Sequence, residues 1–308
     1  MSASSHLPLQ ALLTLAWRNL WRNHRRTLIM MLAISVGVWA MIFMTALMRG
    51  MVDQMLKEGI NALPGHVQVH HPAYRDDPSI ENSMDQPGPA FSAALQHPEV
   101  TAWSSRVRVP AMISSERDNR GVTLLGVEPD SEIALGFDPD SILEGRFLES
   151  AGDNGLVIGR KLLQRLETDL GKRVVVMSQD PDNNIADRGF RVVGVYKAKL
   201  TATEEAFIYA GRDTVQALLG LEQQVSEIAV GGRNYREVDA LQSLVQTAAG
   251  PDVEVLNWKE LDGYLGTMMR VMDGFVLVWV IVIFLALSFG LVNTLMMAVF
   301  ERVREIGL

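Results

Sequence analysis

Two groups of side chains have the types and spacing that could bind a metal ion. His66, His70 and His71 lie in a short β-branched segment, and imidazole is a common zinc ligand. Strand alternation places His66 and His70 on one face and His71 on the other, with no carboxylate at ligand spacing, so we expect a solvated strand. The segment 180–184 (DPDNN) has the composition of a calcium loop. However, Ile185 occupies the glycine position and no glutamate follows at the twelfth position, which favours a polar hairpin loop.

Motifs for catalysis are missing from the sequence. It contains no G-x-x-x-x-G-K-[ST] phosphate-binding loop, no G-x-S-x-G nucleophile turn and no cysteine. These absences exclude a fused ATPase of the common type, disulfides and reactive thiols. We therefore expect no catalytic residues, no metal site and no cofactor bound by this chain.

Two uncharged apolar runs dominate a chain of 308 residues that is 48% hydrophobic. The first, Leu28–Met48, and the second, Phe275–Phe300, are each long enough to cross a bilayer, since a span needs about 20 residues. The first run is longer than the apolar core of a signal peptide, which favours an uncleaved span. We expect two transmembrane helices, at residues 28–48 and 275–300.

Charge predicts the orientation of these spans. Four arginines lie between residues 18 and 26, so the positive-inside rule places the N-terminus in the cytoplasm. Residues 51–270 would then lie outside, with 21 basic and 33 acidic side chains. A segment this acidic argues against a nucleic-acid partner.

The segment ahead of the first span, within residues 1–27, has helical apolar spacing over Pro8–Arg22. This pattern predicts an amphipathic helix in the inner membrane interface, and a plain charged flank is the alternative. The candidate membrane-interface residues are Trp17, Arg18, Trp21, Arg22, Arg25 and Arg26.

Helical spacing also continues beyond both spans on the outer side, over residues 49–61 and 258–274. Two amphipathic helices rising from two spans form a stalk, and their apolar faces could pair with each other or close a four-helix neck in a dimer. The candidate substrate or stalk residues are Met55, Ile60, Leu265, Met268, Met269 and Met272. Flexible thioethers suit varied apolar substrates, and core packing explains these methionines equally well.

Residues 62–257 have the pattern of a mixed α/β domain. The predicted strands are His66–His70, Arg106–Ser114, Val122–Val127, Arg173–Ser178, Phe190–Tyr196, Ala206–Ala210 and Glu227–Val230. The predicted helices are Arg160–Glu167, Arg212–Leu219 and Tyr235–Ala249. We expect a mostly β subdomain at about 115–200, inserted into an α/β part formed by the flanks.

A short charged segment, residues 301–308, follows the second run. Glu301–Arg304 and Arg302–Glu305 are i,i+3 pairs that support a helix and leave Val303 and Ile306 on one side for a protein groove. An ordinary charged stop-anchor is the alternative.

These motifs together resemble the MacB/FtsX superfamily of ABC transporter permeases. Leu15–Asn23 is similar to the N-terminal signature, and Asn293–Leu295 followed by Glu301–Gly307 is similar to the start of the FtsX-type domain and its coupling segment. The outer-domain motifs are similar in order to those of the lipoprotein-releasing (LolC/LolE) permeases: Gly126–Pro129, Leu143–Arg146, Ile158–Gly159, Gly171–Val174 and Val193–Val195.

The resemblance implies an α+β protein of the bacterial inner membrane with a periplasmic domain, and four spans, of which this chain would lack the last two. It implies ATPase-coupling residues Glu301, Arg302, Val303, Arg304, Glu305, Ile306 and Gly307. The implied partners are a separate ABC ATPase that binds ATP-Mg, a second permease copy or paralogue, membrane lipids and a periplasmic lipoprotein carrier.

The function implied is a non-enzymatic permease subunit that extracts or exports lipoproteins or lipids by stalk motion. Two alternatives stay open within the superfamily: an FtsX-like signalling subunit that controls an extracytoplasmic partner, and MacB-like peptide or drug efflux. A receptor or adhesion module, which would need no ATPase, is a third alternative.

Overall fold

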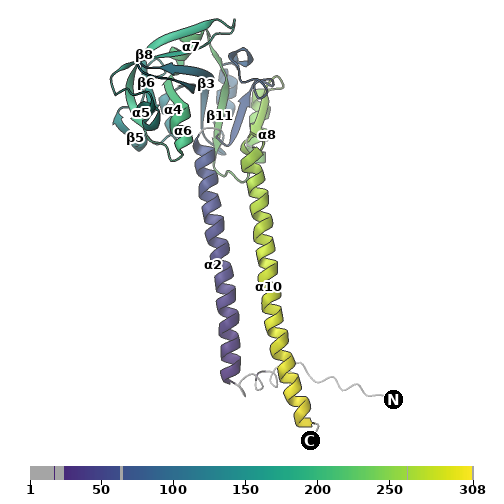
Figure 1. Cartoon of the computed structure of the whole chain (residues 1–308). Helices are drawn as coiled ribbons and strands as arrows, with labels where there is room; N and C mark the ends of the chain where they lie inside the picture. The colour runs from purple at the N-terminus through teal and green to yellow at the C-terminus, as the bar shows by residue number, and fades with distance from the viewer. Residues whose placement is uncertain (1–16, 18–23, 63–64, 262, 307–308) are drawn as a thin grey trace. The chain divides into compact units, whose positions relative to one another are not determined.

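The computed structural model describes Trp17 and residues 24–62, 65–261 and 263–306. By contacts the chain forms two compact units, one made of residues 1–54 and 267–308 and the other of residues 55–266. The second unit contains every strand of the described residues (Figure 1).

Apart from Trp17, the described part of the first unit comes from two long helices, α2 (His24–Ala62) and α10 (Gly263–Ile306). Residues 55–62 of α2 and 263–266 of α10 belong to the second unit. Neither contains a proline, and most of their residues are apolar, so nothing in the sequence interrupts backbone hydrogen bonding. Apolar side chains such as Leu28, Trp39 and Phe284 are exposed.

One segment of the described residues, Thr27–Lys57, is long and apolar enough to cross a bilayer. Gly274–Gly290 in α10 is apolar but shorter than 18 residues. The first predicted span therefore has a matching helix, while the span at 275–300, the stalk and the further spans stay predictions.

The second unit is built on a ten-stranded mixed sheet. Its order is β12-β1-β11-β3-β4-β9-β6-β8-β5, and β7 pairs with both β3 and β8. The strands are β1 (Val67–His70), β3 (Val100–Ser114), β4 (Asn119–Val127), β5 (Ile142–Gly145), β6 (Gly155–Gly159), β7 (Arg173–Gln179), β8 (Ile185–Tyr196), β9 (Phe207–Gly211), β11 (Glu227–Gly232) and β12 (Glu254–Asn257). A separate two-stranded sheet pairs β2 (Met84–Asp85) with β10 (Gln224–Val225).

Short helices connect these strands. They are α3 (Pro89–Ala94), α4 (Pro129–Leu135), α5 (Arg160–Arg165), α6 (Thr201–Ala206), α7 (Arg212–Leu219), α8 (Val238–Ala249) and α9 (Trp258–Leu261), with 3-10 turns η1 (Ile80–Asn82) and η2 (Pro139–Ser141). Proline occupies the first turn of α3 and α4, where its missing N–H costs no hydrogen bond.

The long strand β3 joins the two halves of the sheet. Its first part, through Arg106, pairs with β11, and its second part, from Val107, pairs with β4. The strand β9 follows the predicted insertion of residues 115–200 in the chain, yet it pairs with β4 and β6 of that region. The boundaries of the predicted subdomains stay a prediction.

The two faces of the sheet are covered differently. Leu124 belongs to the main apolar core, which includes side chains of α3, α5, α7 and α8. The next residue, Leu125, belongs to a smaller cluster with Tyr196 and Tyr209. Successive strand residues point to opposite faces, so these clusters lie on opposite sides of the sheet. We call the first the core face. We call the second the polar face, because it also carries the charged residues Arg106, Arg108 and Glu227.

The strands and helices predicted for residues 62–257 are all present, several with different bounds. The predicted amphipathic helix over Pro8–Arg22 lies, except for Trp17, outside the described residues. The expectation of a solvated strand at His66–His70 is wrong, because all four residues of β1 are buried between β11 and β12. Nδ1 of His66 instead accepts a hydrogen bond from the Gly232 amide at 2.8 Å, and burial lowers the His66 pKa.

The polar hairpin loop between β7 and β8 is confirmed. Oδ1 of Asp180 accepts hydrogen bonds from the amides of Asp182 (3.0 Å) and Asn184 (2.8 Å). Asn183 adopts φ +61°, a left-handed conformation that asparagine tolerates. The Asp180 carboxylate thus stabilises its own turn.

Candidate functional site

The polar face of the sheet carries a buried group of charges where β11, β3 and α4 meet. The guanidinium of Arg106 lies between two carboxylates: its Nε donates to Glu132 Oε2 at 3.0 Å, and its Nη1 donates to Glu227 Oε1 at 3.3 Å. Burial opposes the charge on Arg106, but Glu132 and Glu227 outweigh it and raise the Arg106 pKa. Arg106 therefore stays charged, and its removal would leave two carboxylates buried.

Strand register explains why these residues meet. Glu227 is directly opposite Arg106 in the β11–β3 ladder and opposite His70 in the β11–β1 ladder. Residues opposite each other share a face, and so do residues two apart on one strand. Arg108 therefore follows Arg106 on the polar face, and its Nη1 lies 3.5 Å from Glu227 Oε2.

Two hydrogen bonds to its backbone and one cation–π contact of its side chain fix the position of Arg108. Ser226 Oγ accepts a hydrogen bond from the Arg108 amide (3.0 Å), and Tyr74 Oη donates to the Arg108 carbonyl (3.1 Å). The guanidinium lies 5.8 Å from the centre of the Phe207 ring, a cation–π distance. Burial, and then the charge of Glu227, raises the Tyr74 pKa, which keeps its hydroxyl protonated as a donor.

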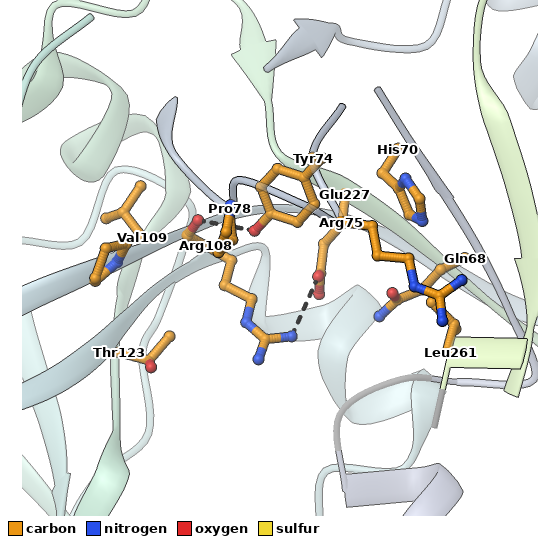
Figure 2. Close-up of a pocket in the computed structure, with 11 residues that line it drawn as sticks. Gln68, His70, Tyr74, Arg75, Pro78, Arg108, Val109, Thr123, Glu227 and Leu261 are labelled. Atoms are coloured by element: carbon orange, nitrogen blue, oxygen red, sulfur yellow. Dashed lines mark hydrogen bonds and ion pairs between the residues drawn. The ribbon is translucent and has the colours of Figure 1, made fainter. Parts of the chain in front are cut away.

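A cavity of about 270 Å³ opens beside these charges (Figure 2). Its sheet residues come from β1, β3, β4 and β11, and its wall is completed by the segment after β1 and by α9. Figure 2 shows the Glu227 carboxylate next to the Arg108 guanidinium, while the Arg75 guanidinium lies on the other side of the Gln68 amide, away from Arg108.

One buried polar atom in this wall, Oε2 of Glu227, has no hydrogen-bond partner among the described residues. The Glu227 side chain is 0% exposed, and the nearest charge to this oxygen is Arg108 Nη1 at 3.5 Å. The ion pair with Arg108 therefore offsets part of the cost of burying this oxygen.

Among the residues that the structure describes, no group of three or more His, Asp or Glu could hold a metal ion. The cavity wall offers charged donors and acceptors together with the apolar sides of Pro78, Pro110 and Leu261. This combination suits recognition of a small polar molecule.

The predicted coupling residues fall at the end of α10. Glu301–Ile306 are helical, and Val303 is exposed. The side chains of Glu301, Arg302, Arg304, Glu305 and Ile306 lie outside the described part of the chain, as does Gly307. Their role stays a prediction.

The predicted interface residues lie at the start of the chain. Trp17 is helical and exposed, and Arg25 is an exposed residue of α2. The side chain of Arg26 and the whole of Arg18, Trp21 and Arg22 lie outside the described residues.

The predicted stalk residues lie on α2 and α10. Met55 is exposed and Ile60 is buried, both within the second unit, and Met272 is half-buried. The side chains of Leu265, Met268 and Met269 are outside the described part.

Sequence reasoning missed the cavity. A signal was present: Arg106 and Arg108 alternate with valines in a predicted strand, and Glu227 begins another predicted strand. Charged residues on a strand buried on both faces need partners, so these positions could have been flagged as a buried ionic group.

The family of the chain is shown by a match to the model of the MacB-like periplasmic core domain over residues 27–248. The match covers more than half of the chain, and the chain belongs to this family. It is a permease-type member of the MacB/FtsX group of ABC transporters, which confirms the resemblance drawn from the sequence motifs.

Relatives among known proteins include the lipoprotein-releasing system transmembrane protein LolC of Neisseria meningitidis serogroup B. It is 21% identical over 291 residues, which cover 92% of this chain and 68% of the relative. The periplasmic region of MacB from Actinobacillus actinomycetemcomitans has a TM-score of 0.45 at 13% identity, covering 70% of this chain and 96% of that one. The extracellular domain of the noncanonic ABC-type transporter YknZ from Gram-positive bacteria has a TM-score of 0.42 at 14% identity, covering 62% and 99%.

Proposed function

We propose that this chain is a transporter subunit without ATPase activity of its own, and that a separate ABC ATPase drives movement of its outer domain. The observation that carries the proposal is the family match, which begins at residue 27 inside the apolar helix α2 and extends to residue 248. The family domain is thus continuous with a helix that is long and apolar enough to span a bilayer.

The ATPase would contact the C-terminal end of α10 and displace it during ATP hydrolysis. The segment Glu301–Ile306 extends the apolar helix without a break, so a displacement at one end would be passed along a single rod of hydrogen-bonded turns. The exposed Val303 would fit an apolar groove of the ATPase, and the charges beside it would orient the contact.

We propose lipoproteins or lipids as the substrate class. The relation to a lipoprotein-releasing transmembrane protein over 92% of the chain supports this choice. MacB-like efflux is the second candidate, because the family model is that of the MacB-like periplasmic core domain.

The domain of residues 55–266 would lie outside the inner membrane and the N-terminus in the cytoplasm. The chain has no native cysteine, so single introduced cysteines report the topology directly. A membrane-impermeant maleimide should label Asp182→Cys in intact cells and Ser4→Cys only after lysis. Labelling of both in intact cells would refute the topology.

The coupling test uses affinity purification of the chain in mild detergent, followed by measurement of vanadate-sensitive ATP hydrolysis. We expect an ABC ATPase to co-purify, and Arg304→Glu to lower hydrolysis at least ten-fold by reversing a contact charge. Arg117→Glu, at an exposed arginine of the outer domain, is the matched control.

Two results would contradict the proposal: an absence of any co-purified ATPase, or full hydrolysis by the Arg304→Glu variant. Co-purified lipoproteins would support the lipoprotein substrate, and peptides or drugs would favour efflux.

A further inference from the structure

The two long helices connect to the sheet at directly opposite residues. The helix α2 ends at Ala62 and β1 begins at Val67, while β12 ends at Asn257 and is followed by α9 and then α10. Val67 and Asn257 face each other in the antiparallel β1–β12 ladder. The Trp258 amide also donates a hydrogen bond to the His66 carbonyl at 3.0 Å. Both connections are therefore made on one pair of neighbouring strands, at the same end of the ladder.

The end of α2 is fixed by burial. Leu56 is 2% exposed and Ile60 is 0% exposed, in contrast to the exposed apolar residues earlier in the same helix. The Gly65 amide donates to the Ile60 carbonyl, and the His66 amide donates to the Val230 carbonyl of β11, both at 2.9 Å. Gly65 has φ +68°, a backbone conformation that glycine adopts without strain. Apolar packing and backbone hydrogen bonds thus tie the end of α2 to the sheet.

The start of α9 is fixed by a reciprocal pair of side-chain hydrogen bonds. Oδ1 of Asn257 accepts from the amides of Lys259 (3.0 Å) and Glu260 (3.3 Å). Oε2 of Glu260 accepts from the Asn257 amide at 3.1 Å. The residue before the helix and the residue three positions later thus bond to each other's backbone, which is a capping box. Because Asn257 is also the last residue of β12, this box joins the sheet directly to the helix.

Gln242 on α8 ties the capping box to the rest of the domain. Its Nε2 donates to Glu260 Oε2 and to the Val255 carbonyl of β12, both at 2.9 Å. Its Oε1 accepts from Asn257 Nδ2 at 2.7 Å. One amide side chain therefore contacts the strand and both members of the capping box. We call Asn257, Glu260 and Gln242 the strand–helix joint.

Two further contacts hold α9 in place. The Trp258 side chain is 0% exposed, and its Nε1 donates to the Tyr235 carbonyl at 2.7 Å. Arg75, in the segment after β1, donates from Nη2 to the Glu260 carbonyl at 3.2 Å, and the adjacent Tyr74 donates to a carbonyl of β3 at 3.1 Å. The short helix α9 is thus bonded to β12, to α8 and, through the segment after β1, to β3.

We propose that the strand–helix joint is where displacement of α10 is delivered to the sheet, with Asn257, Glu260 and Gln242 as positioning residues. The helix α9 ends at Leu261 and α10 begins at Gly263, so a displacement of α10 reaches the joint over a very short length of chain. The joint passes it to β12 and, through the β1–β12 ladder, to the strand that follows α2. Because the joint bonds both the strand and the helix start, α10 cannot move along β12 without breaking several hydrogen bonds at once.

This inference rests on the proposed function, since it assigns a route to a movement that the ATPase would drive. It predicts that breaking the joint separates ATP hydrolysis from movement of the domain. Arg304→Glu, at the other end of α10, should instead lower hydrolysis itself. The two kinds of variant therefore distinguish the route of the movement from the contact with the ATPase.

The experiment uses the complex of the full chain with its co-purified ATPase in lipid nanodiscs. Asp182→Cys, at an exposed position of a chain without native cysteine, is labelled in intact cells with a membrane-impermeant donor dye, which spares a cytoplasmic ATPase. The nanodisc lipids carry the acceptor dye, so energy transfer reports the height of the domain above the bilayer. ATP hydrolysis is measured on the same sample. We expect ATP with vanadate to change the energy transfer of this parent protein.

The decisive variant is Asn257→Ala, which removes the side chain that caps α9 and bonds Gln242. We expect the ATP-dependent change in energy transfer to fall at least five-fold, while hydrolysis stays within two-fold of that of the parent. Asn257→Asp is the rescue variant, because aspartate caps a helix as well as asparagine does, and it should keep most of the change.

Glu260→Ala repeats the test at an exposed residue, where folding is least at risk, and should give the same loss of movement. Glu260→Gln keeps the capping box, since glutamine serves at this position as glutamate does, and should move like the parent. Asp138→Ala is the matched control: it removes the capping hydrogen bond of η2, elsewhere in the domain, and should leave both signals unchanged.

The outcomes separate this inference from the proposed function. No ATP-dependent change in the parent protein would overturn the proposed function and the inference with it. A normal change in the parent together with an equal change in Asn257→Ala and Glu260→Ala would overturn the inference alone. Equal losses in Asn257→Ala and Asn257→Asp would also overturn it, because the cap would then not be what transmits the displacement.

Discussion

The two faces of the ten-stranded sheet are built on alternate residues of the same strands, yet they bury different chemistry. In β3, Val107 and Val109 point into the main apolar core, while Arg106 and Arg108 point to the polar face. Helices of the domain cover the core face with apolar side chains. The polar face holds charged side chains, aromatic rings and a cavity.

The difference shows how one strand serves two purposes. Apolar burial on the core face supplies most of the favourable free energy of folding, because buried apolar area is stabilising wherever it packs. Charges on the polar face add little net stability, since desolvation offsets much of their attraction. Their retention there is better explained by a requirement for polar groups at fixed positions, as a binding site needs.

The largest effect is expected for Arg106→Met on the polar face. Loss of the guanidinium leaves Glu132 and Glu227 buried without their partner, which should lower the free energy of unfolding by about 3–5 kcal/mol. Urea unfolding of the full chain in detergent, followed by near-ultraviolet circular dichroism, measures the change.

The control for this variant is Arg117→Met, which breaks the exposed ion pair with Glu167 at 2.9 Å. It should change stability by less than about 1 kcal/mol. Equal losses for the two variants would mean that the polar face is solvated and that the contrast between the faces is wrong.

The second prediction is a loss of stability on removing a side chain from the core face. Leu124→Ala removes a fully buried side chain of the main core and should cost about 3 kcal/mol, because the surrounding helices and strands cannot close the cavity left behind. The same unfolding measurement applies. Leu143→Ala, at an exposed leucine of β5, should cost less than about 1 kcal/mol, and a comparable loss there would contradict the assigned core.

The smallest effect is expected for Tyr74→Phe, which removes the hydrogen bond to the Arg108 carbonyl at a cost of about 1 kcal/mol. The contribution of Tyr74 to the free energy of unfolding should also depend on pH. Because burial raises the Tyr74 pKa in the folded protein, the unfolded chain ionises first as pH rises above about 10. The stability that this tyrosine contributes is present below about pH 10 and is lost as pH rises toward the folded pKa.

Unfolding free energies of the wild type and of Tyr74→Phe at pH values from about 8 to 11 test this sign. The wild type should lose more stability over the alkaline part of the range than the variant, while the buried Tyr209 contributes to both. Parallel curves would show that Tyr74 ionises as an ordinary exposed tyrosine.

Local patterns predicted a large part of the fold. The β-branched runs of β1, β3, β4, β7, β8 and β11 were recognisable, and α7 has the predicted bounds. The strand β6, Gly155–Gly159, was missed because glycine at both ends reads as a turn signal. In the structure a Cβ at either glycine would collide with Val193 or Glu204, so close packing requires those glycines.

The candidate site was far less accessible to sequence reasoning. Gln68, Arg108 and Glu227 are up to 159 positions apart in the chain, and only the sheet register brings them to one face. No local spacing encodes that register. The histidines of β1 were misjudged for the same reason, since their burial depends on β11 and β12.

The uninterrupted course of β3 has a mechanical consequence. Its fifteen residues belong to both halves of the sheet, so the halves share one covalent backbone and cannot rotate freely about a flexible connection. A force applied to β11 would be transmitted to β4 through β3 alone, because β3 is hydrogen-bonded to both. Arg106 and Arg108 lie where β3 changes its partner from β11 to β4, so the buried ion pairs sit at the junction of the two halves.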